Sequence, residues 1–498
     1  MIARDIAAAV LLLGHYLVMV LLSAYGAHRL YLAWRQWRST ASTVPEWQFN
    51  CLPYVTVQLP VYNERHVIAR LIDAAVALDY SADRLEIQIL DDSTDDTVAI
   101  AAARAAYHQA RGVKIVHIQR PDRTGYKAGA LAYGLERARG EFLLILDADF
   151  VPAPDFLRKL IDPLADPRVA MVQARWGYLN RERNLLTRAQ AVLLDAHFAI
   201  EHSQRAAAGL FFNFNGTAGI WRKAAIADAG GWSARTLTED LDLSYRAQLA
   251  GWRFVYQGDV VCLSELPADM NAFKTQQHRW TKGSIEVMLR LITAIWRAKV
   301  PLPVKIEATV HLTSNLAYLL IIVECLILFA PGVVVREMYR LDALLWIDAL
   351  LLVMASLSHL SFFLFGQRTL RNGTWASARE IAVLIPVLIG LALNNGRAVI
   401  EALLGLRSGF VRTPKQGGVG RAAVRRRDPL YRAASSRLGE WTEIGLGFAF
   451  AVFAIWLVDH QYWLSTPFAV LFSVSFLVIG IGSLKAHEPT RQQRLRLA

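Results

Sequence analysis

The order of apolar and polar positions divides the chain into a periodic central region and two apolar flanks. In residues 50–300, short apolar segments typical of strands alternate with segments of helical periodicity. The predicted strands are 54–59, 86–90, 114–118 and 142–146, and the predicted helices between them are 65–78, 97–108 and 127–137. Because this alternation gives parallel strands joined by crossover helices, the sequence predicts an α/β domain over residues 50–300.

The N-terminal flank contains an apolar run long enough to cross a bilayer, from residue 6 to about residue 32. Arg35 and Arg38 follow it, so we interpret residues 1–40 as a retained transmembrane anchor whose C-terminal end is cytoplasmic. A secretory signal peptide is the alternative. The run is too long for one, and it lacks a clear small-residue cleavage site.

The C-terminal flank contains four further runs that suffice to span a membrane, and one shorter run at 381–393 that we expect to be interfacial. Together with the anchor, these runs predict an α-helical transmembrane domain of about five spans. The predicted parts are two transmembrane helices in 301–366, an interfacial helix and a loop in 379–440, two transmembrane helices in 441–485 and a basic cytoplasmic tail in 486–498.

Charge is consistent with this topology. With five spans, the arginines of 368–379, those of 407–437 and the basic tail all lie inside, as the positive-inside rule requires. The net charge of +12 is also compatible with nucleic-acid binding. However, no basic stripe interleaved with aromatic residues occurs in the central region, so we expect a lipid bilayer and no nucleic acid as partner. The cysteines are far apart and indicate no disulfide framework, which fits a reducing compartment.

Two carboxylates directly follow the predicted strand 142–146. Asp147 and Asp149 are separated by one residue, so in extended backbone their side chains point to the same side. The carboxyl end of a buried strand is where an open α/β sheet binds its ligand. Hard oxygen ligands suit Mg²⁺ or Mn²⁺, usually shared with substrate phosphates. The alternative is an ordinary solvated loop or a helix cap.

Four other positions are candidates for chemistry, each with a structural alternative. Asp92 ends the second strand and suits a nucleotide or a turn. Lys127 lies in a glycine-containing loop that opens a helix, where a pyrophosphate or merely a tight turn would fit. Asp240 lies in the first turn of a predicted helix, where a carboxylate is also favoured by the helix dipole. His278 lies on a predicted amphipathic helix and has no metal-ligand partner at helical spacing.

The order of these motifs resembles the family 2 glycosyltransferases that make β-linked polysaccharides, and most closely the plant cellulose-synthase-like glucomannan and mannan synthases. The matching segments are 63–65, 90–95, 125–131, 172–176, 214–219 and 276–280, the last being Gln-Gln-His-Arg-Trp. They cover residues 50–300 densely. Residues 410–415 also resemble the family's gating loop, Phe-x-Val-Thr-x-Lys, although Arg412 stands where the family has Val. The family contains members with an appended cyclic-dinucleotide-binding domain, and we expect none here.

The resemblance implies a Rossmann-like GT-A fold for the α/β domain and a role for each matching residue. For catalysis it implies Asp240 as general base with Glu239 and Thr238, and for the metal, Mg²⁺ or Mn²⁺, it implies Asp147 and Asp149. For the donor nucleotide it implies Tyr62, Glu64, Asp92, Lys127, Asp147, Gln276, Arg279, Trp280, Thr413 and Lys415. For the acceptor it implies Trp280, Thr238 and His278.

The function expected from the resemblance is inverting transfer of a hexose from UDP-glucose or GDP-mannose to the non-reducing end of a growing β-glycan. The enzyme would lie in the inner (plasma) membrane of a bacterial-type cell with its catalytic domain in the cytoplasm. It would export the polymer, alone or with accessory export subunits. A single-transfer glycolipid glycosyltransferase, acting on ceramide or diacylglycerol, is the alternative enzyme, and a non-catalytic transporter or scaffold is the third class.

Polar residues inside the predicted spans indicate how export would occur, because such groups are costly in a bilayer and mark pathways or internal pairs. They are Asn315, Glu324, Asp348 and His359. A glycan conduit would use them for hydroxyl groups and would use Tyr318 and Trp346 as flat apolar surfaces. The alternative is that Glu324 and His359 pair within a packed bundle.

Overall fold

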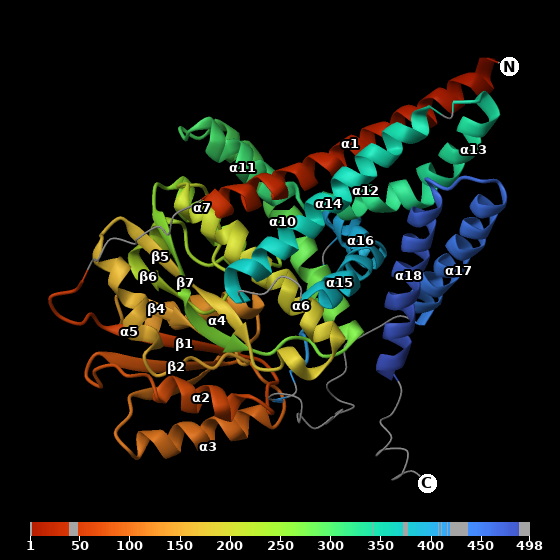
Figure 1. The fold of residues 1–498 in the computed structure, drawn as a ribbon. Coiled ribbons are helices and arrows are strands. Elements are labelled where there is room, and N and C mark those ends of the chain that lie inside the picture. The colour runs from red at the N-terminus through yellow and green to blue at the C-terminus, as the bar shows by residue number, and fades with distance from the viewer. Residues whose placement is uncertain are drawn as a thin grey trace, which may run out of the picture.

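The computed structural model describes residues 2–38, 48–341, 343–371, 377–406, 408–409, 411–415, 417–418 and 437–487. These residues form an α/β domain and a helical region beside it (Figure 1). The predicted segment 410–415 is therefore described from residue 411 onward, and the basic tail 486–498 lies almost entirely outside the described residues.

A seven-stranded sheet in the order β3-β2-β1-β4-β6-β5-β7 forms the centre of the α/β domain. The strands are β1 (Val55–Val61), β2 (Leu85–Asp91), β3 (Ile115–Gln119), β4 (Phe142–Ile145), β5 (Val169–Tyr178), β6 (Gly219–Arg222) and β7 (Arg253–Ser264). The first four strands are parallel, which confirms the sequence prediction. β6 is antiparallel to both of its neighbours, so the sheet is mixed.

Both faces of the sheet are covered, so the side chains on both faces of β1 and β4 are buried, including the polar Thr56 and Gln58 of β1. One core joins the sheet to α2, α3 and α5, and the other joins it to α4, α8 and α9. These helices are α2 (Ile68–Val76), α3 (Thr97–Gln109), α4 (Tyr126–Arg137), α5 (Phe156–Ile161), α8 (Lys223–Asp228) and α9 (Glu239–Leu249). The parallel strands β1, β2 and β4 therefore all present their carboxyl ends at one edge of the sheet.

The helical region has five helices long and apolar enough to cross a membrane, which confirms the predicted number. They are α1 (Ile2–Arg38), the composite span Leu316–Tyr339, α14 (Leu344–Arg371), α17 (Arg437–Asp459) and α18 (Thr466–His487). The composite span consists of α12 (Leu316–Val323), the π-helix η4 (Glu324–Leu328) and α13 (Phe329–Tyr339). The number rises to six if α15 (Ala378–Gly390) and α16 (Ala392–Leu403), bent by 43°, form one broken span.

The apolar run that begins near residue 308 is divided between two helices. α11 (Leu302–Thr313) ends before the composite span begins at Leu316. The apolar side of α11 packs against the core of α10 (Met270–Arg297), with Ala308 and Leu312 fully buried. Hydrophobicity alone does not separate burial against protein from burial in lipid, so the sequence could not place this boundary.

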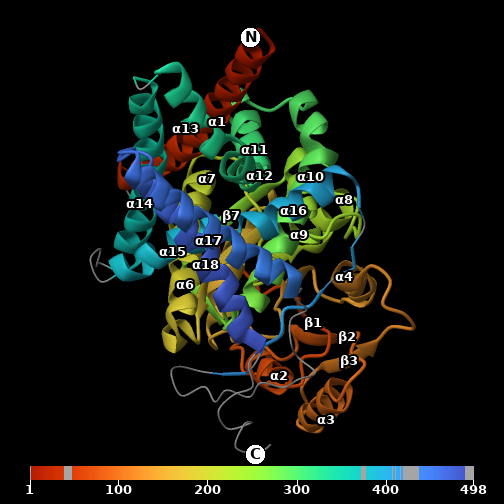
Figure 2. The same cartoon turned by 90° about the vertical axis from the view of Figure 1, so that its right-hand side faces the viewer.

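Two segments connect the α/β domain to the membrane helices. The first is the run α6 (Leu185–Ala196), the π-helix η3 (His197–His202) and α7 (Ser203–Ala207), part of which shares a core with α1, α14 and α15. The second is α10, which packs on α15 and α18 (Figure 2). The contact between α6 and α14 requires close packing, because a Cβ on Gly366 of α14 would lie 2.8 Å from the Ala196 backbone. The short 3-10 turns η1 (Asp162–Ala165) and η2 (Arg181–Arg183) complete the domain.

Candidate active site

A pocket of about 170 Å³ lies at the sheet edge where β1, β2 and β4 end. Its lining includes almost every residue that the sequence suggested: Tyr62, Glu64, Asp92, Lys127, Asp147, Asp149, Thr238, Glu239, Asp240, Gln276, Arg279, Trp280, Thr413 and Lys415. His278 is the exception. It points toward α16, with its Nε2 3.5 Å from a Glu401 carboxylate oxygen, and its acceptor role stays a prediction.

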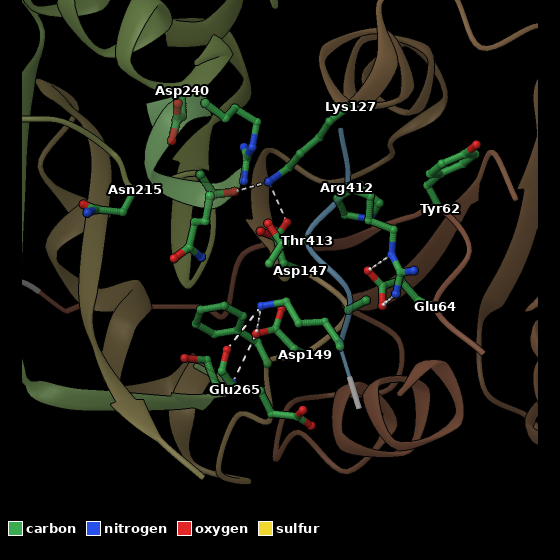
Figure 3. Close-up of a pocket in the computed structure, with 18 of the residues that line it drawn as sticks. Tyr62, Glu64, Lys127, Asp147, Asp149, Asn215, Asp240, Glu265, Arg412 and Thr413 are labelled. Carbon is green, nitrogen blue, oxygen red and sulfur yellow. Dashed lines mark hydrogen bonds and ion pairs between the residues drawn. The ribbon is translucent and has the colours of Figure 1, made fainter. Parts of the chain in front are cut away.

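The two carboxylates after β4 are each held by a lysine (Figure 3). The Lys127 Nζ donates to Asp147 Oδ1 at 2.5 Å, and the Lys415 Nζ donates to Asp149 Oδ2 at 2.7 Å. Asp149 is buried and also accepts a hydrogen bond from the Glu265 backbone amide. The buried Asp149 and the partly exposed Asp147 are thus compensated by cations from two distant parts of the chain.

Lys127 connects the candidate metal side of the pocket to the candidate catalytic side. Its Nζ donates to the Gly216 carbonyl at 2.9 Å and lies 3.8 Å from a Glu239 oxygen. Burial opposes its charge, but the carboxylates of Asp147 and Glu239 outweigh burial and raise the pKa of Lys127. The glycine loop that carries this lysine starts α4 with Gly125 at a φ of 75°, a left-handed conformation that suits glycine.

Asp240 lies in the first turn of α9, as predicted, and its environment raises the pKa of its carboxyl group. Burial and the neighbouring Glu239 charge raise the pKa of Asp240 to about 7. Gly216, at a φ of 82°, lets the backbone approach this carboxylate: a Cβ there would lie 2.9 Å from Asp240 Oδ2. A carboxylate with a pKa near neutrality is suited to accept a proton from a hydroxyl group.

Three functional candidates on α10 share one face of that helix. Gln276, Arg279 and Trp280 are three and four residues apart, which places them side by side above the pocket. The helix starts at Asp269, whose side chain caps it by accepting from the Ala272 amide at 2.9 Å. Trp280 lies 6.5 Å from Trp176, ring centre to ring centre, so the candidate acceptor side of the pocket is aromatic.

The loop after α16 crosses the pocket and is fastened there by ion pairs (Figure 3). Arg412 donates to both carboxylate oxygens of Glu64, at 2.9 and 2.6 Å. Burial raises the pKa of Glu64 to about 7, although the Arg412 charge acts in the opposite direction. The Gly417 amide donates to Glu265 at 3.1 Å. The departure of Arg412 from the gating-loop pattern was visible in the sequence, but its partner was not.

The far end of the pocket is built from an ion pair and a stacked ring. Arg120 donates to both carboxylate oxygens of Asp92, at 2.9 and 2.5 Å. The Arg123 guanidinium lies 3.3 Å from the centre of the Tyr62 ring. The sequence did not single out either arginine, because it does not show toward which part of the fold an arginine side chain in a loop after a strand points.

A second, larger cavity of about 460 Å³ extends from the pocket between the membrane helices. The residues that line both are Trp176, Leu194, Asn215, Thr238, Asp240 and Trp280. Asn315, Tyr318, Glu324 and His359, which the sequence suggested for a conduit, all line this cavity. The pocket and the cavity therefore meet at the candidate base and the candidate acceptor tryptophan.

One sequence prediction about the spans is wrong, and the alternative pairing of Glu324 with His359 does not form. Trp346 is 70% exposed on the outer surface of α14 and does not line the cavity, because its position on the helix faces away from the neighbouring helices. Glu324 does not pair with His359. Glu324 binds His15 of α1 at 2.8 Å, while His359 Nδ1 lies 2.9 Å from the Ala355 carbonyl of its own helix.

Comparison with known proteins agrees with this geometry. The family model described as "Glycosyltransferase like family 2" matches residues 53–283. Glucomannan 4-beta-mannosyltransferase 2 of Arabidopsis thaliana is 48% identical over 252 residues, which are 50% of this chain and 47% of that protein. Glucomannan 4-beta-mannosyltransferase 1 of Oryza sativa subsp. japonica is 42% identical over 294 residues, or 57% of this chain and 55% of that protein. The chain thus spans about half the length of the curated relatives it matches.

A solved structure shares the fold. The mannosyltransferase PcManGT from Pyrobaculum calidifontis, in complex with GDP-Man and Mn²⁺, superposes with a TM-score of 0.53 at 20% identity and covers 79% of this chain and 100% of that chain. The mixed sheet, the position of the pocket at its carboxyl edge and the family match over residues 53–283 agree with one another. The chain therefore carries a glycosyltransferase domain, which matches family 2 over residues 53–283.

Proposed function

We propose that this enzyme transfers hexose units from a nucleotide sugar to the non-reducing end of a β-glycan and passes the growing polymer into the membrane. The observation that carries the proposal is that the candidate active-site pocket and the membrane cavity share Asp240 and Trp280. A product formed at Asp240 therefore has the membrane cavity directly beside it. The names of the relatives, glucomannan 4-beta-mannosyltransferases, favour a mannosyl donor, GDP-mannose, over UDP-glucose.

In the proposed inverting transfer, each of these pocket residues has a different role. Asp240 accepts the proton of the attacking acceptor hydroxyl, and its raised pKa places it in the useful range. Trp280 supplies a flat face for the acceptor sugar. Arg279, on the same helix face, and Lys127 supply positive charge for the diphosphate, whose negative charge increases as the bond to the sugar breaks. One base and no covalent intermediate suffice for inversion.

Asp147 and Asp149 fit a divalent cation. They offer hard oxygen atoms from one strand end, and Mg²⁺ is commonly bound by one or two carboxylates together with substrate phosphates. When bound, Mg²⁺ or Mn²⁺ would neutralise charge on the diphosphate leaving group. Lys127 and Lys415 compensate the same carboxylates in the structure described here, and each would then be available to the diphosphate.

The membrane cavity suits a polyhydroxylated chain. Its lining combines aromatic rings with polar groups: Tyr25, Tyr318, Phe362, Phe472, His28, Asn315 and Glu324. Sugar rings present apolar faces and hydroxyl edges, so both kinds of wall are needed along one path. We propose that the catalytic domain is cytoplasmic, in a bacterial-type inner membrane, because the positive-inside rule assigns the arginine-rich loops of the sequence to the cytoplasmic side.

Supplying single donors to the purified protein tests the proposed reaction. With GDP-mannose and Mn²⁺ we expect a long polymer that an endo-β-mannanase degrades, and with UDP-glucose alone a much lower rate. Product size before and after digestion, with labelled donor, is the measurement. A short, solvent-extractable glycolipid as the main product would contradict polymer synthesis and would favour single transfer.

Replacing Asp240 by Asn should remove transfer while leaving donor binding nearly unchanged. Loss of a general base lowers rates by about 10²–10⁴. We expect kcat to fall by that amount and the donor Kd, measured by tryptophan fluorescence, to stay close to the parent value. Asp83→Asn, at an exposed carboxylate far from the pocket, is the matched control.

The parent enzyme should also show an acid limb in its pH–rate profile. Asp240 acts as a base only when deprotonated, so the rate should increase with pH until about 7, the raised pKa of this group, and then level off. The residual rate of Asp240→Asn should not follow that limb. Near-normal turnover in this variant, or an identical limb, would exclude Asp240 as the base.

Removing either candidate metal ligand should abolish metal-dependent transfer and weaken metal binding itself. For Asp147→Ala and Asp149→Ala we expect a large loss of Mn²⁺ affinity, measured by electron paramagnetic resonance in the presence of GDP, as well as loss of activity. Asp155→Ala, at a half-exposed carboxylate outside the pocket, is the control. Full activity of the parent enzyme in chelator would remove the metal from the reaction.

A bulky side chain in the cavity should stop elongation but not donor hydrolysis. Asn315→Trp places an indole beside the path, whereas Leu350→Trp adds the same group on the outer surface of α14 and serves as control. With protein in sealed vesicles, we expect lumenal polymer from the parent and the control only. Normal elongation by Asn315→Trp, with all polymer left on the donor side, would show that these helices only anchor the protein and do not conduct the polymer.

A further inference from the structure

The membrane cavity ends at a group of buried charges. On α1 its lining residues Met19, Leu22, Tyr25 and Arg29 are three or four positions apart and therefore share one helix face. The next position outward on that face, four residues before Met19, is His15. The N-terminal end of α1 points away from the catalytic domain (Figure 1). Because His15 precedes the cavity-lining residues of this helix, it lies on their outer side.

Two other helices reach the same place by the same spacing. On α14 the cavity is lined from Phe362, near the catalytic domain, to Leu352, and four residues further outward is Asp348. On the composite span, the lining continues along α12 to Glu324 at the start of η4. π-helical turns of this kind recur at functional sites. The cavity-lining faces of three helices thus converge on three ionisable residues.

Ion pairs join these residues into one unit. His15 Nδ1 lies 2.8 Å from Glu324 Oε1, and His15 Nε2 lies 3.1 Å from Asp348 Oδ1. Arg336 of α13 completes the unit, with its Nη2 2.7 Å from Asp348 Oδ2. None of the four residues is more than 8% exposed. We call His15, Glu324, Arg336 and Asp348 the exit cluster.

One carboxylate oxygen of the exit cluster has no hydrogen-bond partner among the described residues. Among the residues that the structure describes, none donates a hydrogen bond to Glu324 Oε2, although that atom is buried. Glu324 is also the member of the exit cluster that lines the cavity. A buried carboxylate oxygen without a donor is costly, so this atom is prepared to accept a hydrogen bond from something that enters the cavity.

Holding the helices together does not by itself explain the exit cluster. Well-packed apolar side chains usually replace a buried ion-pair network with little loss of stability, or with a gain. Ionisable groups inside spans are rare and usually belong to a pathway. The position of the exit cluster at the end of a cavity that begins at the catalytic pocket points to the same conclusion.

We propose that the exit cluster is a hydroxyl-binding gate through which the polymer leaves the cavity. This inference rests on the proposed conduit and extends it. The arriving ligand is a neutral polyhydroxylated chain. One of its hydroxyl groups donates to Glu324 Oε2, and its oxygen atoms accept from the N–H groups of His15 and Arg336 as the ion pairs separate. Hydrogen bonds to sugar thus replace ion pairs, and no buried charge is left without a partner.

The first test is Glu324→Leu in sealed vesicles that carry the catalytic domain outside. This change removes the hydroxyl acceptor and leaves a balanced set, with Arg336 and His15 still bound to Asp348. Vesicles receive GDP-mannose and Mn²⁺ outside, external polymer is digested with endo-β-mannanase, and lumenal polymer is then measured. We expect loss of lumenal polymer, while donor hydrolysis and the formation of short external products continue.

A second variant separates gating from stability. Replacing all four members with apolar residues (His15→Leu, Glu324→Leu, Arg336→Met and Asp348→Leu) should keep or raise Tm and should also abolish lumenal polymer. The control is the pair Lys274→Met and Glu443→Leu, which removes another buried ion pair, 2.6 Å long, that does not line the cavity. The control should export polymer as the parent does.

The outcomes distinguish this inference from the conduit on which it rests. Lumenal polymer from the parent and from both exit-cluster variants would overturn the gate and leave the conduit intact. Absence of lumenal polymer from the parent itself would overturn the conduit and the gate together. If Glu324→Leu loses donor hydrolysis as well and the fourfold variant exports normally, the exit cluster only stabilises the fold.

Discussion

The packing of α10 against both the sheet domain and the membrane helices is the constraint on which the rest of the structure depends. One face of this helix carries Gln276, Arg279 and Trp280 into the pocket. Another part of it packs on α18, and its C-terminal half packs on α11. At Gly283 the helix backbone meets Thr238 so closely that a Cβ would lie 2.5 Å from the Thr238 side chain. The same contact fixes the start of α9, and with it Asp240.

Charge burial at the sheet edge follows from this packing. The membrane helices and the loop after α16 cover a strand edge that would otherwise face water, so its carboxylates need partners from the protein. Lys127 comes from a neighbouring crossover helix, while Arg412 and Lys415 come from the covering loop itself. The site is therefore complete only when domain and membrane region are assembled, although its carboxylates belong to the sheet.

The predictable part of the molecule is the part where local sequence decides structure. The strand before Asp147 is apolar throughout, and polar residues mark the ends of the neighbouring strands. Both the parallel strands and the strand ends that bear carboxylates were therefore predictable. β5, β6 and β7 were not predicted, because their order and the antiparallel direction of β6 depend on pairing between distant segments. The count of five spans followed from length and hydropathy alone.

Pairings between distant segments were beyond the sequence. Glu324 was recognised as unusual, but two histidines at membrane depth were available to it, and only the packing of α1 selects His15 over His359. The sequence predicts wrongly that Trp346 lines the cavity, because hydropathy does not determine how a helix is rotated about its own axis. His278 was grouped with its neighbours by motif, yet its position on α10 turns it toward Glu401.

The central claim is that a single path leads from the catalytic base into the membrane. The most direct test is a cryo-electron microscopy structure of the enzyme in a lipid nanodisc, stopped during synthesis by a chain-terminating donor. The account predicts glycan density that begins beside Asp240, stacks on Trp280 and continues past Asn315 to Glu324. Density that leaves the pocket toward the solvent side of the catalytic domain, with an empty cavity between the helices, would contradict it.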